Sequence, residues 1–278
     1  MSVLRLTQIT DTHLGPHYPQ FDRNFDRVCA HLDAERPDIV IHTGDVAFDG
    51  TGNPDDLAYA RNRHKAIAAE CRFIPGNHDI GDNDTLVAPP PSHRATRDHA
   101  DMFASVFGET RWRFDAAGWT FIGLNSLIMN TEADAEAEQN DWLTGELARM
   151  NGNQLALFIH KPVYRNQPDD AELAATSFRY IPQPSRAQLL ARLAAVDLRL
   201  IACGHVHQRR DFTRGHVRHI WGPSASFIIG EKQELIGVKE VGLVEYVFQP
   251  DGFEVHHTRA PGQIDVDLES VLPPEAVH

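Results

Sequence analysis

Polar side chains with metal-binding or acid–base chemistry stand where apolar segments of the chain end. They are Asp11, His13, Asp45, Asn77, His78, His160, His205 and His207. Mixed carboxylate, amide and imidazole ligands suit Mn, Fe, Co or Zn, whereas Ca and Mg prefer shells made only of oxygen. The set is larger than one four-coordinate ion needs, so it fits two ions that share a carboxylate.

Two metal ions about 3.5–4 Å apart can clamp a phosphoryl group and lower the pKa of a bound water to about 7. Hydroxide is then available at neutral pH, so the residue types indicate hydrolysis of a phosphate ester. His205 and His207, taken alone, are equally consistent with a structural turn. In an extended segment their side chains point the same way and Val206 points away, and we expect that arrangement here.

The elements that must position these side chains alternate between strands and helices. In the first part of the chain, strands are expected at 3–9, 38–45 and 71–79, and helices at 21–35 and 53–70. Strand, loop and helix in repetition favour a mostly parallel sheet covered by helices. Ligands of such sheets gather at the carboxyl ends of the strands, which is where the polar residues stand.

The second half continues this pattern and then changes. A strand at 154–164 carries His160, a helix is expected at 185–196, and the apolar run "LRLIA" leads into "CGHVH". From residue 210 onward the pattern is typical of strands, which we expect to form a second sheet against the first.

Composition excludes several classes of protein. The formal net charge is −13 and Lys and Arg form no run, so extended nucleic-acid binding is not expected. No apolar stretch approaches the length of a membrane span, and the start of the chain lacks the pattern of a signal peptide. The three cysteines form no CxxC pair, which suits a reducing cytoplasm. We expect a cytoplasmic protein without a membrane partner.

Five short motifs, in this order, resemble those of the calcineurin-like metallophosphoesterases. They are "DTH" at 11–13, "GD" at 44–45, "GNHD" at 76–79, His160 in "IHKP", and "GHVH" at 204–207. The motifs span most of the chain and no ligand position is missing. The expected fold is an α/β, four-layer α/β/β/α sandwich of two mixed sheets flanked by helices, with the metal site at the carboxyl ends of the strands. We expect a single domain over 1–260 and a C-terminal tail over 261–278.

The resemblance implies a ligand set for two transition-metal ions (Mn, Fe or Zn). One ion is held by Asp11, His13 and His207. The other is held by Asn77, His160 and His205. Asp45 bridges the two ions, and a bridging hydroxide attacks phosphorus in line.

The resemblance also implies catalytic and substrate-binding roles. His78 donates a proton to a phosphate oxygen or to the leaving group, and Asp79 orients His78, as carboxylates commonly orient imidazoles. Asn77, His78 and His205 are the expected substrate-binding residues.

Within this family the chain departs from the protein Ser/Thr phosphatases, because "GDVAFDG" contains no Arg. It is more similar to the bacterial class III phosphodiesterases, which act on cyclic nucleotides or glycerophosphodiesters. We therefore expect hydrolysis of a small-molecule phosphodiester of one of these types. A phosphomonoesterase or nucleotide pyrophosphatase of the same superfamily is the alternative. A metal-free scaffold is disfavoured, because scaffolds usually lose ligands.

Several features leave the substrate and the assembly open. Loops 80–96 and 165–184 are expected to shape the pocket. Side chains with a structural or a substrate-binding interpretation are His17, His93, Asn125, Arg165 and Arg179. The aromatic side chains of 111–126 favour hairpin and core packing, although one ring could stack on a base; they are Trp112, Phe114, Trp119 and Phe121. The apolar segments "SFIIG" and "LVEYVF" could pack in a homodimer, although core burial is the simpler use.

Overall fold

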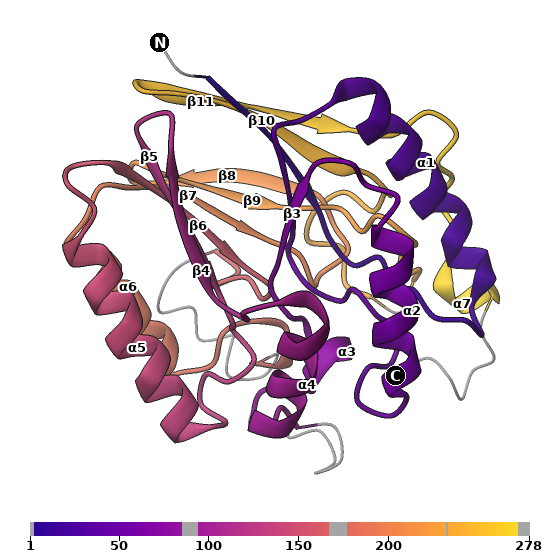
Figure 1. Ribbon diagram of the computed structural model, residues 1–278, viewed down its shortest axis with the longest axis horizontal. Coiled ribbons are helices and arrows are strands. Elements are labelled where there is room, and N and C mark those ends of the chain that lie inside the picture. The colour runs from indigo at the N-terminus through magenta and orange to yellow at the C-terminus, as the bar shows by residue number, and fades with distance from the viewer. Residues whose placement is uncertain (1–2, 85–93, 167–176, 232, 272–278) are drawn as a thin grey trace.

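The computed structural model describes residues 3–84, 94–166, 177–231 and 233–271. Two mixed sheets pack face to face, and helices cover the outer face of each (Figure 1). The four-layer α/β/β/α sandwich that the family resemblance implied is therefore confirmed.

The first sheet has the strand order β11–β10–β1–β2–β3. The strand bounds are β1 Leu4–Ile9, β2 Ile39–His42, β3 Glu70–Phe73, β10 Leu243–Gln249 and β11 Gly252–Thr258. β1, β2 and β3 pair in parallel, and β10 lies antiparallel to β1. The expectation that all late strands form the second sheet is wrong for β10 and β11. Their buried residues Val244, Tyr246 and Phe248 complete the apolar face beside β1.

The second sheet has the strand order β4–β5–β6–β7–β9–β8. The strand bounds are β4 Trp112–Ala116, β5 Trp119–Leu124, β6 Gln154–Ile159, β7 Leu198–Cys203, β8 Arg210–Arg214 and β9 Val217–Trp221. β5, β6, β7 and β9 pair in parallel, whereas β4 and β8 are antiparallel edge strands. The hairpin expected about Ala117 is confirmed.

Helices occupy both outer layers. Their bounds are α1 Pro19–Glu35, α2 Pro54–His64, α3 Asn77–Ile80, α4 Arg97–Phe107, α5 Ala133–Ala148, α6 Ser185–Leu193 and α7 Leu268–Val271. A 3₁₀ turn, η3, spans Ser177–Arg179. In Figure 1, α1 and α2 lie outside the first sheet, α5 and α6 lie outside the second, and α3 and α4 lie near the ends of the strands.

Three apolar layers hold the sandwich together. Phe25 and Val28 of α1 pack with Val40 on the outer face of the first sheet. Leu143 of α5 and Leu189 of α6 pack on the outer face of the second sheet. The two sheets meet through residues such as Leu6, Ile41, Trp119, Phe121 and Phe158. Burial of this apolar area is the main force that stabilises the layers.

Parts of the tail and of the late apolar segments are buried. Phe227 of "SFIIG" and Val244 of "LVEYVF" lie in the interior. In the tail, Gln263 donates to the carbonyl of Ala225, and Leu268 is buried. Residues 272–278 lie outside the described part of the chain.

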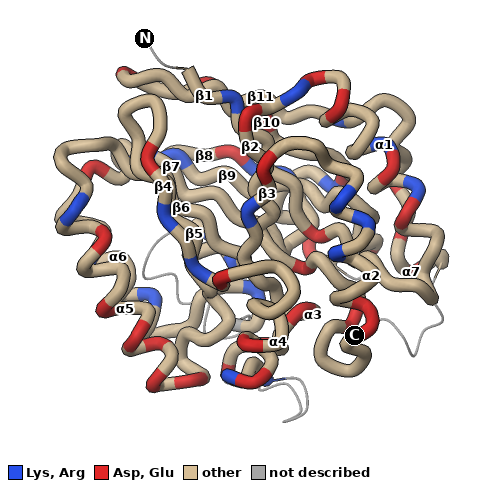
Figure 2. The backbone as a smooth tube through the Cα atoms, viewed as in Figure 1, with Lys and Arg blue, Asp and Glu red and all other residues tan. Residues whose placement is uncertain are grey.

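Charged residues of both signs are spread along the described chain, and Figure 2 shows Lys and Arg interspersed with Asp and Glu. No helix in the described ranges has the length and apolar character needed to cross a bilayer.

Candidate metal centre

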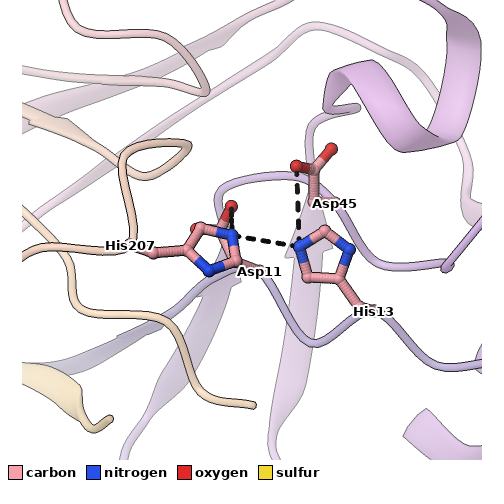
Figure 3. Close-up of side chains that lie close together, drawn as sticks. All are labelled: Asp11, His13, Asp45 and His207. Atoms are coloured by element: carbon pink, nitrogen blue, oxygen red, sulfur yellow. Dashed lines mark hydrogen bonds and ion pairs between the residues drawn. The ribbon is translucent and has the colours of Figure 1, made fainter. Parts of the chain in front are cut away.

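The turns after β1, β2 and β7 bring a first group of ligands together. The group consists of Asp11, His13, Asp45 and His207. Each residue contributes one ligand atom, and these four atoms all lie within 4.8 Å of one another. The Nε2 atoms of His13 and His207 are 3.1 Å apart, and Nε2 of His207 lies 3.3 Å from Oδ1 of Asp11. Figure 3 shows the two rings turned toward each other, with Asp45 beside His13. All four residues are buried.

A second group forms around the other side of Asp45. It consists of Asp45, His160 and His205, with ligand atoms again within 4.8 Å of one another. Nε2 of His160 lies 3.4 Å from Oδ2 of Asp45 and 3.2 Å from Oδ1 of Asn77. Asp45 therefore belongs to both groups, and Asn77 borders the second.

Three of the four histidines in the two groups are held by a backbone carbonyl through one ring nitrogen. Nδ1 of His160 lies 2.7 Å from the carbonyl oxygen of Thr43, and Nδ1 of His207 lies 3.3 Å from that of Phe227. Nε2 of His205 lies 3.0 Å from the carbonyl oxygen of Phe178. A carbonyl only accepts, so each of these nitrogens carries a proton. This is how proteins orient metal-binding imidazoles.

The backbone at the group members is unusual. Five of them have a positive φ in the left-handed region: Asp11 (53°), His13 (45°), Asp45 (53°), His205 (68°) and His207 (55°). This conformation costs a non-glycine residue on the order of 1–2 kcal/mol, and such strain concentrates at functional sites. The extended segment expected at His205 and His207 is therefore wrong. Val206 between them is buried and packs in the core, as expected.

Two glycines are needed here for space. A Cβ at Gly204 would lie 2.0 Å from Oγ1 of Thr10, and one at Gly76 would lie 2.1 Å from Oδ1 of Asp45. Because both approaches are far inside contact distance, the polar turns can close only when these positions have no side chain.

Electrostatics couple Asp45 to the histidines around it. Burial raises the pKa of Asp45, but His160 and His78 outweigh burial and hold that pKa well below its usual range. Burial lowers the pKa of His160, but the carboxylate of Asp45 outweighs it and raises the pKa to about 9. Burial, together with the neighbouring His78, lowers the pKa of His13. The carboxylate thus favours a positive charge at the centre.

Asp79 and His78 do not make the contact expected from the sequence. The carboxylate of Asp79 accepts hydrogen bonds from the backbone N–H groups of Val46, Ala47 and Gly76. Nδ1 of His78 instead lies 2.6 Å from the carbonyl oxygen of Phe48. Asp79 therefore joins the turn after β2 to the turn after β3, because its buried carboxylate accepts from backbone N–H groups of both turns.

The remaining candidates from the sequence lie outside the two groups. His17 is exposed, and His93 lies outside the described residues. Arg165 and Arg179 face Glu234, with nitrogen–oxygen distances of 2.7 and 3.9 Å. Loops 80–96 and 165–184 are described only in part.

Asn125 and the aromatic hairpin residues have structural contacts. Asn125 is buried, and its Oδ1 accepts from the backbone N–H of Leu127. Trp119 and Phe121 are fully buried in the interface between the sheets. These contacts support the structural interpretation of Asn125, Trp119 and Phe121.

One buried charge beside the centre has no motif signal beyond its place after His160. Lys161 is buried, and its ammonium forms an ion pair with Asp82. The backbone N–H of Lys161 donates to Oγ of Ser126 at 3.1 Å. The only clue in the sequence is that a lysine directly follows a predicted ligand.

The residues of the two groups fit a pair of cations. The two carboxylates converge with the imidazoles in largely buried space, and carbonyls hold one nitrogen each of His160, His205 and His207. Nδ1 of His13 is buried without a partner in the described chain. Imidazole with carboxylate ligands suits Zn, Fe or Mn.

Curated relatives cover most of the chain. A 3′,5′-cyclic-nucleotide phosphodiesterase from Nostoc is 25% identical over 81% of this chain and 79% of its own. A 3′,5′-cyclic adenosine monophosphate phosphodiesterase from Pseudomonas aeruginosa is 28% identical over 79% of this chain and 75% of its own. A probable glycerophosphodiester phosphodiesterase from Arcobacter nitrofigilis is 23% identical over 91% and 88%, respectively.

Solved structures share the fold, and a family model matches the sequence. A dimetal phosphatase from Danio rerio aligns with a TM-score of 0.62 at 13% identity, covering 92% of this chain and 96% of its own. Purple acid phosphatase from yellow lupin aligns with a TM-score of 0.65 at 14% identity, covering 96% of this chain and 53% of its own. The model described as "Calcineurin-like phosphoesterase" matches residues 4–209, which include every residue of the two groups. The chain therefore belongs to the calcineurin-like phosphoesterase family of hydrolases.

Proposed function

We propose that this protein is a dinuclear metal-dependent phosphodiesterase that hydrolyses small phosphodiesters, of the 3′,5′-cyclic nucleotide or glycerophosphodiester type. The observation that carries the proposal is that Asp45 belongs to two ligand groups at once. The relatives from Nostoc, Pseudomonas and Arcobacter, all named as phosphodiesterases, support a diester substrate.

In this proposal Asp11, His13 and His207 hold one ion, and Asn77, His160 and His205 hold the other. Asp45 holds both. The two ions, Mn, Fe or Zn, supply the positive charge that polarises a phosphoryl group and the acidity that makes hydroxide available near neutral pH.

The chain's own residues orient the substrate and handle protons. His78 borders the centre, because its backbone N–H donates to Oδ1 of Asp45 at 2.8 Å and its ring lies 4.5 Å from the ring of His13. With Nδ1 of His78 on the carbonyl of Phe48, its Nε2 is available to a phosphate oxygen or to the leaving group. We assign substrate contact to Asn77, His78 and His205. Asp79 acts through the backbone as a positioning residue.

The test is hydrolysis of bis-p-nitrophenyl phosphate with added Mn²⁺ by the wild type and by Asp45→Asn. The variant should lose at least a hundredfold in kcat/KM and bind fewer than two ions per chain, because one neutral oxygen replaces a shared carboxylate. Asp251→Asn, in the exposed β10–β11 turn, is the matched control and should behave as the wild type. Equal turnover by Asp45→Asn would contradict the proposal.

The same assay decides between diester and monoester chemistry. A monoester carries more negative charge and usually needs additional cationic contacts, whereas Arg165 and Arg179 already face Glu234. We therefore expect a higher kcat/KM for the diester than for p-nitrophenyl phosphate. The reverse order would assign a phosphomonoesterase.

A cytoplasmic location is part of the proposal. Cys29, Cys71 and Cys203 are all free thiols, which suits a reducing compartment. Fractionation of the native host should find the protein with other cytoplasmic enzymes.

A further inference from the structure

A small aromatic cluster, distinct from the three core layers, runs outward from the first ligand group. The ring of Phe227 lies 4.8 Å from the rings of both His13 and His207, and 4.8 Å from the ring of Phe21. Phe21 and Phe227 are fully buried. These two rings therefore form the inner end of the cluster, against the metal ligands.

The outer end of the cluster is only partly buried. Tyr18 and Phe48 stack with ring centroids 3.6 Å apart and an interplanar angle of 27°. Both rings are partly exposed and pack against the buried Phe21. The two rings are contributed by the turn before α1 and by the turn after β2, so they adjoin two of the ligand-bearing turns.

Phe48 stands at the edge of the centre. Its ring lies 6.4 Å from the ring of His13 and 6.1 Å from that of His78. Its carbonyl oxygen accepts a hydrogen bond from Nδ1 of His78, with 2.6 Å between the two atoms. A group attached to a phosphate that accepts from Nε2 of His78 would therefore lie within reach of this aromatic pair.

Charge near the Tyr18–Phe48 pair restricts what can bind there. Burial raises the pKa of Tyr18, and the nearby carboxylates of Asp56 and Asp49 raise it further. Those carboxylates disfavour a second phosphate or another anion at this end. A planar, uncharged group suits this position, because such a group can stack on the rings of Tyr18 and Phe48 and adds no negative charge.

We propose that Tyr18 and Phe48 form a stacking platform for a planar aromatic group of the substrate, which in a natural phosphodiester is a nucleobase. The inference rests on the proposed function and narrows it to nucleoside phosphodiesters rather than glycerophosphodiesters. Neither Tyr18 nor Phe48 belongs to a ligand motif, so the platform determines specificity and takes no part in the bond-making step.

A competing platform exists on the other side of the centre. Phe178 is 37% exposed and its carbonyl accepts from Nε2 of His205. However, the guanidinium of Arg179 lies 5.1 Å from the ring of Phe178, so one cation already occupies this ring. The Tyr18–Phe48 pair has no such partner among the described contacts.

The test compares substrates with and without a planar group. Phe48→Leu keeps an apolar side chain and removes the ring. Stacking of a base on an aromatic side chain contributes about 1–3 kcal/mol, so kcat/KM for 3′,5′-cyclic AMP and for bis-p-nitrophenyl phosphate should fall about tenfold or more. The wild type should prefer both to glycerophosphocholine, and kcat/KM for glycerophosphocholine should not change in the variant. Phe48→Trp, which keeps an aromatic ring, should retain the preference of the wild type for these two substrates over glycerophosphocholine.

Two controls separate the platform from general damage. Phe253→Leu removes a partly buried ring from β11, far along the first sheet, and should leave all ratios unchanged. Phe178→Leu tests the competing platform. A loss of preference in Phe178→Leu without a loss in Phe48→Leu overturns the proposal, as does an equal loss for all substrates in Phe48→Leu.

A binding measurement keeps this inference separate from the proposed function. Calorimetry with the Mn²⁺-loaded protein should show that Phe48→Leu weakens adenosine 5′-monophosphate about tenfold and leaves inorganic phosphate unchanged. If the wild type hydrolyses no diester but this difference appears, the platform stands and the proposed function fails. If diesters are hydrolysed and adenosine 5′-monophosphate binds equally to both proteins, the platform is wrong.

Discussion

At the scale of single residues, what a histidine does follows from the partner of its second nitrogen. His160 and His207 each present one nitrogen to a carbonyl and the other to a carboxylate of the centre. His205 likewise presents one nitrogen to a carbonyl and lies beside Asp45. His64 differs, because its ring lies among Phe25, His42 and Phe73, and no carboxylate of the described residues pairs with it. Its Nδ1 is satisfied by the carbonyl of Ala60, and its Nε2 is buried without a partner in the described chain.

His64 should make folding stability depend on pH. Burial lowers the pKa of His64 to about 4, below the ordinary value of about 6.5. Its contribution is therefore complete above pH 6.5 and is lost as the pH falls from 6.5 toward 4. Between pH 7.5 and pH 5 the loss amounts to about 2 kcal/mol of the free energy of unfolding. Urea unfolding of the chelator-treated wild type and of His64→Leu measures this difference.

Between pH 7.5 and pH 5, the free energy of unfolding of His64→Leu should fall by about 2 kcal/mol less than that of the wild type, whatever the absolute stability of the variant. His256→Gln, at an exposed position, is the control and should keep the slope of the wild type. An unchanged slope in His64→Leu would show that His64 does not titrate between the two states.

At the scale of elements, the ligands are delivered by turns that continue the pairing of their strands. The backbone N–H of Asp11 donates to the carbonyl of Gly44, and that of His13 donates to the carbonyl of Asp45. The N–H of Gly204 likewise donates to the carbonyl of His160. The left-handed residues are thus held by hydrogen bonds between neighbouring turns, which offset the cost of their conformation.

The ion pair between Lys161 and Asp82 connects the ligand-bearing turn after β6 to the turn after α3. Asp82→Asn should lower the free energy of unfolding by about 3–5 kcal/mol, because it leaves the buried ammonium of Lys161 unpaired. The double variant Lys161→Met/Asp82→Asn should lose less than Asp82→Asn alone. Urea unfolding of the single and double variants measures this coupling.

The exposed pair Arg97–Glu138 is the matched control. Glu138→Gln should leave the free energy of unfolding nearly unchanged, since solvent screens the pair. If the double variant of Lys161 and Asp82 is as unstable as the sum of its single variants, the two side chains do not interact.

At the scale of the whole molecule, the centre joins the two sheets. Asp11, His13 and Asp45 follow strands of the first sheet, whereas His160 and His207 follow strands of the second. Any cation held by both sets stabilises the packing of one sheet on the other, because the ligands exist as a group only in the folded state.

Chelation should therefore lower the thermal stability of the whole domain. A cation present at a hundred times its Kd stabilises the folded state by about 2.7 kcal/mol. The Tm measured by calorimetry should fall on treatment with a chelator and return when Mn²⁺ or Zn²⁺ is added. Asp45→Asn should show a much smaller shift. An equal shift in this variant would place the stabilising ion elsewhere.

The sequence by itself determined the residue types of the centre and their place at strand ends. Apolar runs followed by Asp, Asn or His are local patterns, and parallel strands necessarily bring their carboxyl ends to one edge. The two-sheet sandwich was implied by the family resemblance, whereas the strand pattern alone placed β10 and β11 in the wrong sheet. The contact of Asp79 was not predictable, since the N–H groups of Val46, Ala47 and Gly76 come together only when two turns pack.

The family resemblance implied which residues lie beside His205 and His207, but only the tertiary structure decided the backbone conformation that directs them there. An extended segment turns alternate side chains the same way, but left-handed backbone at both histidines brings one to His160 and the other to His13. The platform likewise joins Tyr18 and Phe48, which stand far apart in the chain. These contacts depend on packing between distant segments, and a pattern of neighbouring residues carries no information about such packing.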